Sequence, residues 1–137
     1  MHQGGCFCGA IRYLVTATPF HSTLCHCTMC RRAAGAPAVA WFSVPKTGLL
    51  YTSGTPAYYA SSPGVLRRFC AACGTQLAFE DARWPDEIDV TTASLDDPEL
   101  IPPGDHTFMQ SHVQWLQLAD TLPRYVRTRA EGVVQVP

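Results

Sequence analysis

The chain has 137 residues, of which 47% are hydrophobic and 15% are charged, and its formal net charge at pH 7 is −1. These values are typical of a globular domain that buries a core without disulfides, and they exclude a disordered chain. A nucleic-acid-binding surface is not expected, because Lys46 is the only lysine and no basic run is longer than two arginines.

The chain carries no sign of a targeting or membrane segment. Its first residues include no apolar signal stretch, and nothing approaches the run of about 20 apolar residues that a membrane helix needs. We therefore expect a cytoplasmic protein with no membrane partner. Thiols stay reduced in the cytoplasm, so clustered cysteines there are more often metal ligands or redox groups than disulfides.

Short runs rich in β-branched and aromatic residues follow one another along the chain, separated by Gly and Pro. The expected strands are 11–17, 39–44, 49–52, 65–69, 76–79 and 87–92. A turn or two of helix is expected over 28–34, and one turn near Pro98 with Asp97 as its cap. Residues 101–105 are predicted to be a loop. The pattern predicts a single, mainly β domain over residues 1–137 with only short helical turns.

The aromatic and histidine side chains carry weaker signals. Trp41 and Phe42 are assigned to the core because they lie in a predicted strand. The same assignment is made for Tyr58, Tyr59, Trp84, Trp115 and Tyr125. His106 and His112 belong to no motif, and we do not expect either to line a site.

Seven cysteines in three tight clusters are the most informative feature of the chain. The clusters are Cys6-x-Cys8, Cys25-x-Cys27-x-x-Cys30 and Cys70-x-x-Cys73. An odd number of cysteines cannot close entirely into disulfides, whereas thiolates two or three residues apart can converge on one soft ion such as Zn²⁺. The division into two, two and three predicts two zinc ions per chain, one in a closed four-sulfur site and one with an open position.

The four-sulfur site is expected to combine Cys6 and Cys8 with Cys70 and Cys73. A glycine follows each pair directly, as in a zinc knuckle where the residue after the turn takes a positive φ. The alternative is that the first pair consists of ordinary buried thiols and the second is a redox motif. Redox CxxC motifs usually open a helix, whereas the residues after Cys73 have a strand pattern, which favours structural zinc.

The three-sulfur site would use Cys25, Cys27 and Cys30. His26 is expected to point away from the metal, because a tetrahedral centre rarely takes three consecutive residues; a site closed by His26 is the alternative. Three thiolates around Zn²⁺ leave a net charge of −1, which weakens the acidification of bound water. A small thiol is therefore a better partner than a hydrolytic water.

Arg31 and Arg32 follow Cys30 directly. Their guanidinium groups could hold a carboxylate of the thiol partner in a bidentate manner. Equally, they could be solvated surface charges or partners of Asp81 and Asp86. The sequence leaves both interpretations open.

Three segments carry a resemblance to a known family: GCFCGAIRY (5–13), CHCTMCRR (25–32) and FCAACGTQL (69–77). They resemble the signature blocks of the glutathione-dependent formaldehyde-activating (GFA) enzyme family, which also includes the domain of centromere protein V. The resemblance implies a β-tent fold of stacked antiparallel sheets with two zinc ions. It assigns the structural zinc to Cys6, Cys8, Cys70 and Cys73, and the catalytic zinc to Cys25, Cys27 and Cys30.

The same resemblance implies a reaction. The family's named reaction joins glutathione to formaldehyde, giving S-(hydroxymethyl)glutathione, and is classed as that of a carbon–sulfur lyase in reverse. The leading hypothesis is therefore a zinc-dependent lyase that binds glutathione at the open three-cysteine zinc and forms or cleaves its aldehyde adduct. One rival is a non-catalytic zinc-binding or glutathione-carrier module, and another is a redox protein in which Cys27 and Cys30 cycle between thiol and disulfide.

Overall fold

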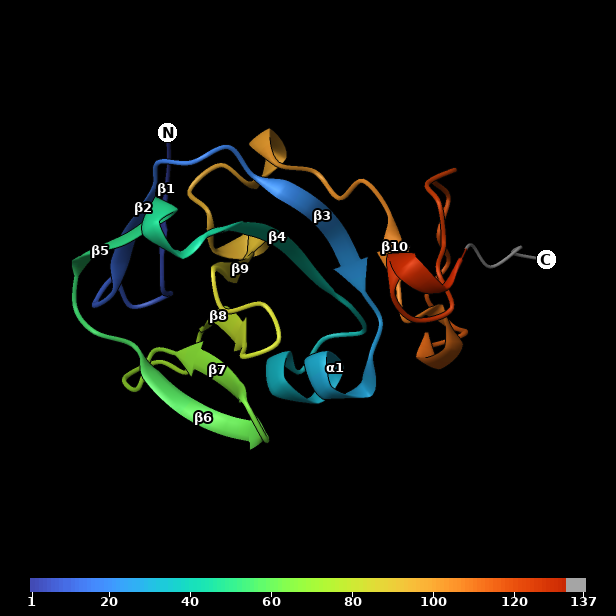
Figure 1. Ribbon diagram of the computed structural model, residues 1–137, viewed down its shortest axis with the longest axis horizontal. Coiled ribbons are helices and arrows are strands. Elements are labelled where there is room, and N and C mark those ends of the chain that lie inside the picture. Colours follow the sequence, from blue (N-terminus) through green and yellow to red (C-terminus); the bar gives the residue numbers. More distant parts are fainter. Residues whose placement is uncertain (133–137) are drawn as a thin grey trace.

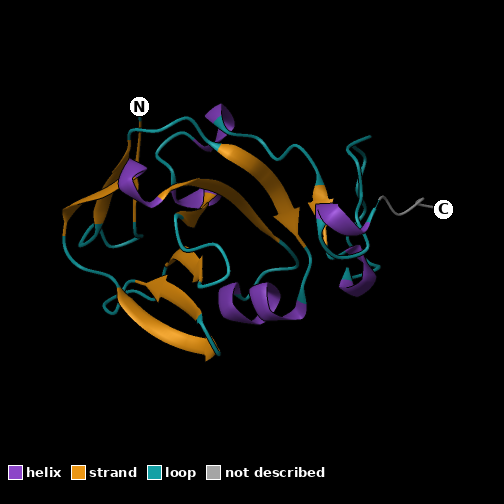
Figure 2. Ribbon diagram, in the orientation of Figure 1, coloured by secondary structure: helices purple, strands orange, loops and turns teal. Residues whose placement is uncertain are grey.

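The computed structural model describes residues 1–132 and consists mainly of β-strands (Figures 1 and 2). The strands are β1 (His2–Gly5), β2 (Arg12–Val15), β3 (Phe20–Cys25), β4 (Val39–Pro45), β5 (Leu49–Ser53), β6 (Ala57–Ser62), β7 (Val65–Phe69), β8 (Gln76–Asp81), β9 (Glu87–Thr91) and β10 (His106–Thr107). The helices of the described residues are α1 (Thr28–Ala34) and the 3-10 turns η1 (Lys46–Gly48), η2 (Thr92–Ser94), η3 (Pro98–Leu100), η4 (Met109–Ser111) and η5 (Arg129–Glu131).

The strands form two sheets. The smaller sheet has the order β1-β2-β5, and the larger has the order β10-β3-β4-β9-β8-β7-β6. Neighbouring strands are antiparallel except β10, which runs parallel to β3. The small sheet lies at one end of the molecule, and β10 with the C-terminal segment lies at the other (Figure 1). The predicted mainly β fold of antiparallel sheets with short helical turns is confirmed.

The main core is formed by side chains from both sheets. In β2, alternate residues Tyr13 and Val15 are buried, and they pack in one cluster with Phe42 and Val44 of β4 and Leu77 of β8. Alternation of this kind buries one face of a strand and leaves the other partly open. The core therefore depends on the small sheet being held against the large one.

The aromatic assignments are confirmed only in part. Trp41 and Phe42 are buried, as predicted. Tyr58, Tyr59, Trp84 and Trp115 are instead exposed by 62% or more, and Tyr125 is half-buried. The reason is position: Tyr58 and Tyr59 lie on β6, the last strand of the large sheet, where no further strand of the described residues packs beside them.

The helix at 28–34 coincides with α1, because its boundaries have strong local signals. Cys27 takes the N-cap position, and Gly35 ends the helix with a φ of 62°. Asp97 caps η3 by accepting a hydrogen bond from the Glu99 N–H, also as predicted. No helix among residues 1–132 is long and apolar enough to cross a membrane.

Four strands were not predicted from the sequence, namely β1, β3, β6 and β10. In β1 the residues are HQGG, which carry little strand propensity of their own. Pairing with β2 places Gly4 opposite Tyr13, whose hydroxyl lies 2.7 Å from Ser94 Oγ. Glycine is required there because the tyrosine ring and the Ser94 carbonyl occupy the space where a side chain would begin.

Replacing Gly4 with alanine is expected to destabilise the protein by about 1–3 kcal/mol, because overpacking forces its neighbours to move. The new Cβ would lie 2.6 Å from the backbone oxygen of Ser94 and would overlap the Tyr13 ring. Urea unfolding measures the change. The control is Gly104→Ala, whose Cβ would meet its nearest neighbour at 3.4 Å; equal losses in the two variants would contradict the packing argument.

Candidate metal centres

Two pairs of cysteines that are far apart in the sequence form one cluster. The Sγ atoms of Cys6, Cys8, Cys70 and Cys73 all lie within 4.8 Å of one another. The Sγ of Cys8 is 3.6 Å from that of Cys6 and 3.8 Å from that of Cys70, although the last pair is 62 residues apart in the chain. The structure thus brings together the two pairs that the sequence predicted, in an arrangement that could hold a metal ion.

Two similar turns present these sulfur atoms. Gly9 N–H donates to the Cys6 carbonyl at 3.1 Å, and Gly74 N–H donates to the Cys70 carbonyl at 2.7 Å. Both glycines have a φ of 80°, in the left-handed region that favours glycine. Ile11 N–H also donates to Cys6 Sγ at 3.2 Å, so a backbone group stabilises negative charge on that sulfur.

Thr75 connects the two turns. Its Oγ1 accepts a hydrogen bond from Phe7 N–H at 3.0 Å and lies 3.2 Å from Cys73 Sγ. Hydrogen bonds from the Thr75 hydroxyl and then from its backbone N–H lower the pKa of Cys73 to about 5. Because metal ligands must be deprotonated, a cysteine that is a thiolate at neutral pH is well suited to bind a cation.

The second cluster is local in sequence. Cys25 ends β3, Cys27 is the N-cap of α1 and Cys30 lies in its first turn, and α1 follows directly on β3 (Figure 1). All three are buried, and their Sγ atoms lie within 4.8 Å of one another. Cys30 N–H donates to Cys27 Sγ at 3.2 Å, so a thiol takes the capping place that Ser or Asp usually fills.

The three thiols influence each other's protonation. Hydrogen bonds from Cys25 and Cys30 lower the pKa of the Cys27 thiol, and contacts with its two neighbours raise the pKa of Cys25. Negative charge is thus favoured at one sulfur and becomes costly at the next. A divalent cation would remove this cost by taking the place of the shared protons, so the donor set fits a soft metal ion.

His26 stands outside this group of sulfurs, and its ring is fully buried beside another histidine. Its Nε2 is 2.9 Å from Nδ1 of His106, whose Nε2 is 3.0 Å from both carboxylate oxygens of Asp120. A carboxylate only accepts, so His106 Nε2 donates to Asp120; in the neutral form of His106, its Nδ1 then accepts from His26 Nε2. Burial, and then the nearby His106, lower the pKa of His26 to about 4, so it is neutral at pH 7.

This position of His106 was not predicted from the sequence, because no motif contains the residue. His106 and His26 are 80 residues apart and meet only because β10 pairs with β3. His112, the other unassigned histidine, instead contacts the backbone oxygen of Met109 at 2.6 Å. The His26–His106–Asp120 chain attaches the loop between Cys25 and Cys27 to the C-terminal part of the protein.

Arg67 is the second residue that the sequence analysis missed. It lies in the middle of β7, is only 4% exposed, and places Nη1 and Nη2 at 3.7 Å and 3.8 Å from Cys30 Sγ. Its guanidinium carbon lies 5.1 Å from the centre of the Phe79 ring. In the sequence Arg67 appeared only as half of a basic pair with Arg68. The two lie in a predicted strand, and strand alternation places neighbouring side chains on opposite faces, which was the signal that one of them points inward.

Arg31 and Arg32, the predicted carboxylate contacts, lie on α1 beyond Cys30. Arg31 is half-buried with its Nε unpartnered, and Arg32 is exposed. Neither forms an ion pair within residues 1–132. The alternative partner Asp81 is bound by Arg83 instead. Both arginines therefore keep the capacity to bind an anion.

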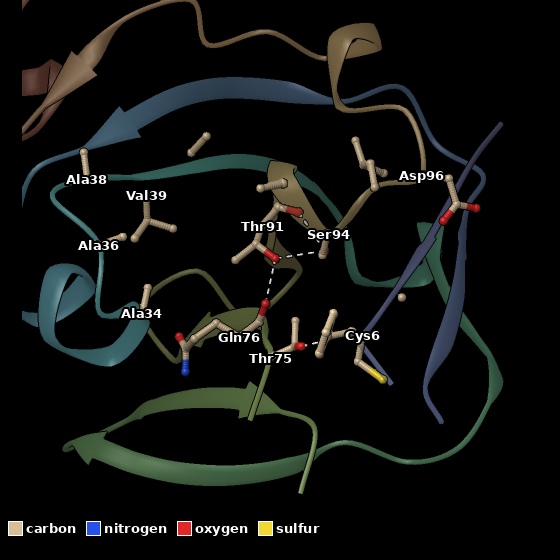
Figure 3. A pocket seen from close by; sticks show the side chains of 15 residues that line it. Cys6, Ala34, Ala36, Ala38, Val39, Thr75, Gln76, Thr91, Ser94 and Asp96 are labelled. Atoms are coloured by element: carbon tan, nitrogen blue, oxygen red, sulfur yellow. Dashed lines mark hydrogen bonds between the residues drawn. The ribbon is translucent and has the colours of Figure 1, made fainter. Parts of the chain in front are cut away.

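A pocket of about 460 Å³ is lined on one side by the segment around the end of α1 and on another by Cys6 of the four-cysteine cluster (Figure 3). Small residues from the end of α1 onwards, including Ala34 and Ala36, line one side, and Gln76 faces them with its buried Oε1 unpartnered. Val39 also lines the pocket, pairs with Cys25 in the sheet and packs with the three cysteines. Through Val39 the pocket adjoins the three-cysteine cluster, although none of these three cysteines lines it, whereas Cys6 of the four-cysteine cluster does.

Comparisons with known proteins agree with this geometry. Residues 1–111 match the model of the family described as "Glutathione-dependent formaldehyde-activating enzyme". The chain is 29% identical over 126 residues to a Halomonas elongata protein named "Putative glutathione-dependent formaldehyde-activating enzyme", with 85% of this chain and 80% of that protein covered. A crystal structure of a Rhodobacter sphaeroides protein shares the fold, with a TM-score of 0.63 and 23% identity over 77% of this chain and 99% of that one. The chain belongs to the glutathione-dependent formaldehyde-activating enzyme family.

Proposed function

We propose that the protein is a zinc-dependent carbon–sulfur lyase that forms or cleaves the adduct of a small thiol, glutathione, with a small aldehyde, formaldehyde. The observation that carries the proposal is the three-cysteine cluster. Cys25, Cys27 and Cys30 converge while the ring of His26 is bound by His106. A tetrahedral ion held by these sulfurs alone keeps one position for a ligand.

The two clusters have different roles in this proposal. Cys6, Cys8, Cys70 and Cys73 would hold a structural zinc, because four soft donors complete its coordination. Cys25, Cys27 and Cys30 would hold the second zinc. When bound there, zinc would supply a soft Lewis acid that favours the deprotonated form of a thiol.

The reaction itself needs no further reagent. The glutathione sulfur forms a bond to the formaldehyde carbon, the C=O π electrons move to oxygen, and the thiol proton ends on that oxygen; cleavage is the reverse. The contribution of the chain would be to hold the two reactants together and to bind the carboxylates of glutathione at Arg31 and Arg32. The family match and the relative's printed name support this substrate pair.

A glutathione carrier is the second candidate, and one observation favours it. His26 and His106 are engaged with each other and with Asp120, so neither ring is free to move a proton at the cluster. A module that only stores the thiol needs no proton donor or acceptor. The rate of formaldehyde–glutathione exchange, with and without Cys27, separates the two candidates.

We also propose a compartment and a domain organisation for the protein. We place it in the cytoplasm, because all seven cysteines are unpaired and that compartment keeps thiols reduced. We further propose that residues 1–137 act as one domain, since both cysteine clusters are attached to the same two-sheet framework.

Native mass spectrometry of freshly reduced protein is expected to find two Zn²⁺ per chain. Cys70→Ser and Cys27→Ser should each lose one ion, but with different effects on stability. Loss of the structural site should lower the melting temperature by about 10 °C or more, because its binding energy is folding energy. Cys27→Ser should lower it by less than half as much; one ion in the unaltered chain would contradict the assignment.

Formaldehyde–glutathione exchange, followed by NMR exchange spectroscopy, is expected to be at least about tenfold faster with the protein than with Cys27→Ser, because positioning lowers the barrier. Met29→Leu is the matched control, since Met29 lies between two of the cysteines and is 54% exposed. It should keep the full rate. Equal rates for the protein and Cys27→Ser, with two zinc ions bound, would leave the carrier as the better description.

Arg31→Gln and Arg32→Gln test the carboxylate contacts. We expect KM for glutathione to rise about tenfold in at least one of them, while 2-mercaptoethanol, which has no carboxylate, is unaffected. The control is Arg83→Gln, whose arginine is bound to Asp81 at the far end of β8 from Cys73. A similar loss for both thiols would assign these arginines to the structure instead of to substrate binding.

A further inference from the structure

Arg67 is a buried charge that has no carboxylate partner in the part of the chain that the structure describes. Arginine stays protonated at any accessible pH, and a buried ion is costly unless another charge balances it. None of the ion pairs among residues 1–132 includes Arg67. The polar contacts of the Arg67 guanidinium are to Cys30 Sγ, at 3.7 Å and 3.8 Å.

Arg68, the next residue on β7, has the contacts of an ordinary surface arginine. Arg68 points to the opposite face of β7, forms an ion pair with Glu80 and lies over the Tyr58 ring. Arg67 has no such acid and instead packs against Phe79, directly opposite it on β8. An aromatic face offsets part of the cost of burying a cation, but it carries no net charge.

The sulfur cluster is therefore the anion that balances Arg67. Three thiolates around a divalent ion carry a net charge of −1, and the guanidinium brings the sum to zero. An anionic fourth ligand would then approach a centre whose net charge is zero. Without Arg67 it would approach a centre whose net charge is −1. Because charges this close interact strongly where water is excluded, the effect falls on anionic ligands and spares neutral ones.

We propose that Arg67 is the counter-charge of the three-cysteine centre and biases its open position towards an anionic ligand, such as a thiolate. Arg67 is then a specificity-determining residue that acts through Cys30 without contacting the reacting carbon. The inference rests on the proposed metal at Cys25, Cys27 and Cys30, but not on the lyase reaction.

The test compares an anionic with a neutral ligand on the Co²⁺-loaded protein. One titration uses 2-mercaptoethanol, which binds as thiolate and releases its proton to the buffer. The other uses imidazole, which binds as a neutral ligand. Both titrations are followed through the cobalt absorption bands. The closed four-sulfur site has no position for either ligand, so the spectral change reports the three-cysteine centre. A structural role for Arg67 would affect both ligands alike, whereas a counter-charge affects only the thiolate.

Arg67→Met removes the charge and keeps an apolar side chain of similar length. We expect it to weaken 2-mercaptoethanol binding by about 10- to 100-fold, the range typical of groups that support metal ligands, with imidazole changed less than about twofold. Arg67→Lys should retain most of the thiolate affinity. Arg68→Met, the matched control, should change neither ligand. If Arg67→Met shows no melting transition, Arg67→Gln replaces it in the same comparison.

The outcomes separate this inference from the proposed function. Equal weakening of both ligands, or no change in either, would overturn the role of Arg67 while leaving the lyase intact. Two bound metals with the expected ligand discrimination, but no acceleration of the aldehyde exchange, would overturn the lyase alone. A chain that binds only one Co²⁺, with Cys27→Ser binding the same amount, would overturn both.

Discussion

The contact between two cysteine turns, one at Cys6 and one at Cys70, is the constraint on which the rest of the structure depends. It joins the end of β1 in the small sheet to the turn between β7 and β8 in the large sheet, and the main core draws on side chains from both sheets. Closing a loop of some 62 residues costs chain entropy that short contacts do not. A metal ion held by four sulfurs would offset this cost, because the ion binds only when the two turns meet.

The three-cysteine cluster is built on a different principle. Its sulfurs come from one short stretch, but its surroundings come from elsewhere: β7 supplies Arg67, and β10 with the following segment supplies His106 and Asp120. The first contact balances charge, and the others hold the loop around His26. The cluster thus combines local geometry with an environment that three separate parts of the chain provide.

What could be predicted from the sequence follows the range of the interactions involved. The boundaries of α1 depend on Cys27 and Gly35, which act within one turn, and they were predicted. The strand β1 depends on a partner, because its two glycines have no strand propensity, and it was missed. Tyr58 and Tyr59 were assigned to the core because their type suits burial, but only their place at the edge of the sheet shows that they are exposed.

The sequence by itself determined the donor chemistry: cysteines two or three residues apart must lie close together whatever the fold, because the covalent chain limits their separation. The pairing of Cys6 and Cys8 with the CxxC turn was also inferred from their number and their glycines. Only the tertiary structure decided the charge around the second cluster. Strand register places Arg67 inside and Arg68 outside, and a shift of one residue would exchange them.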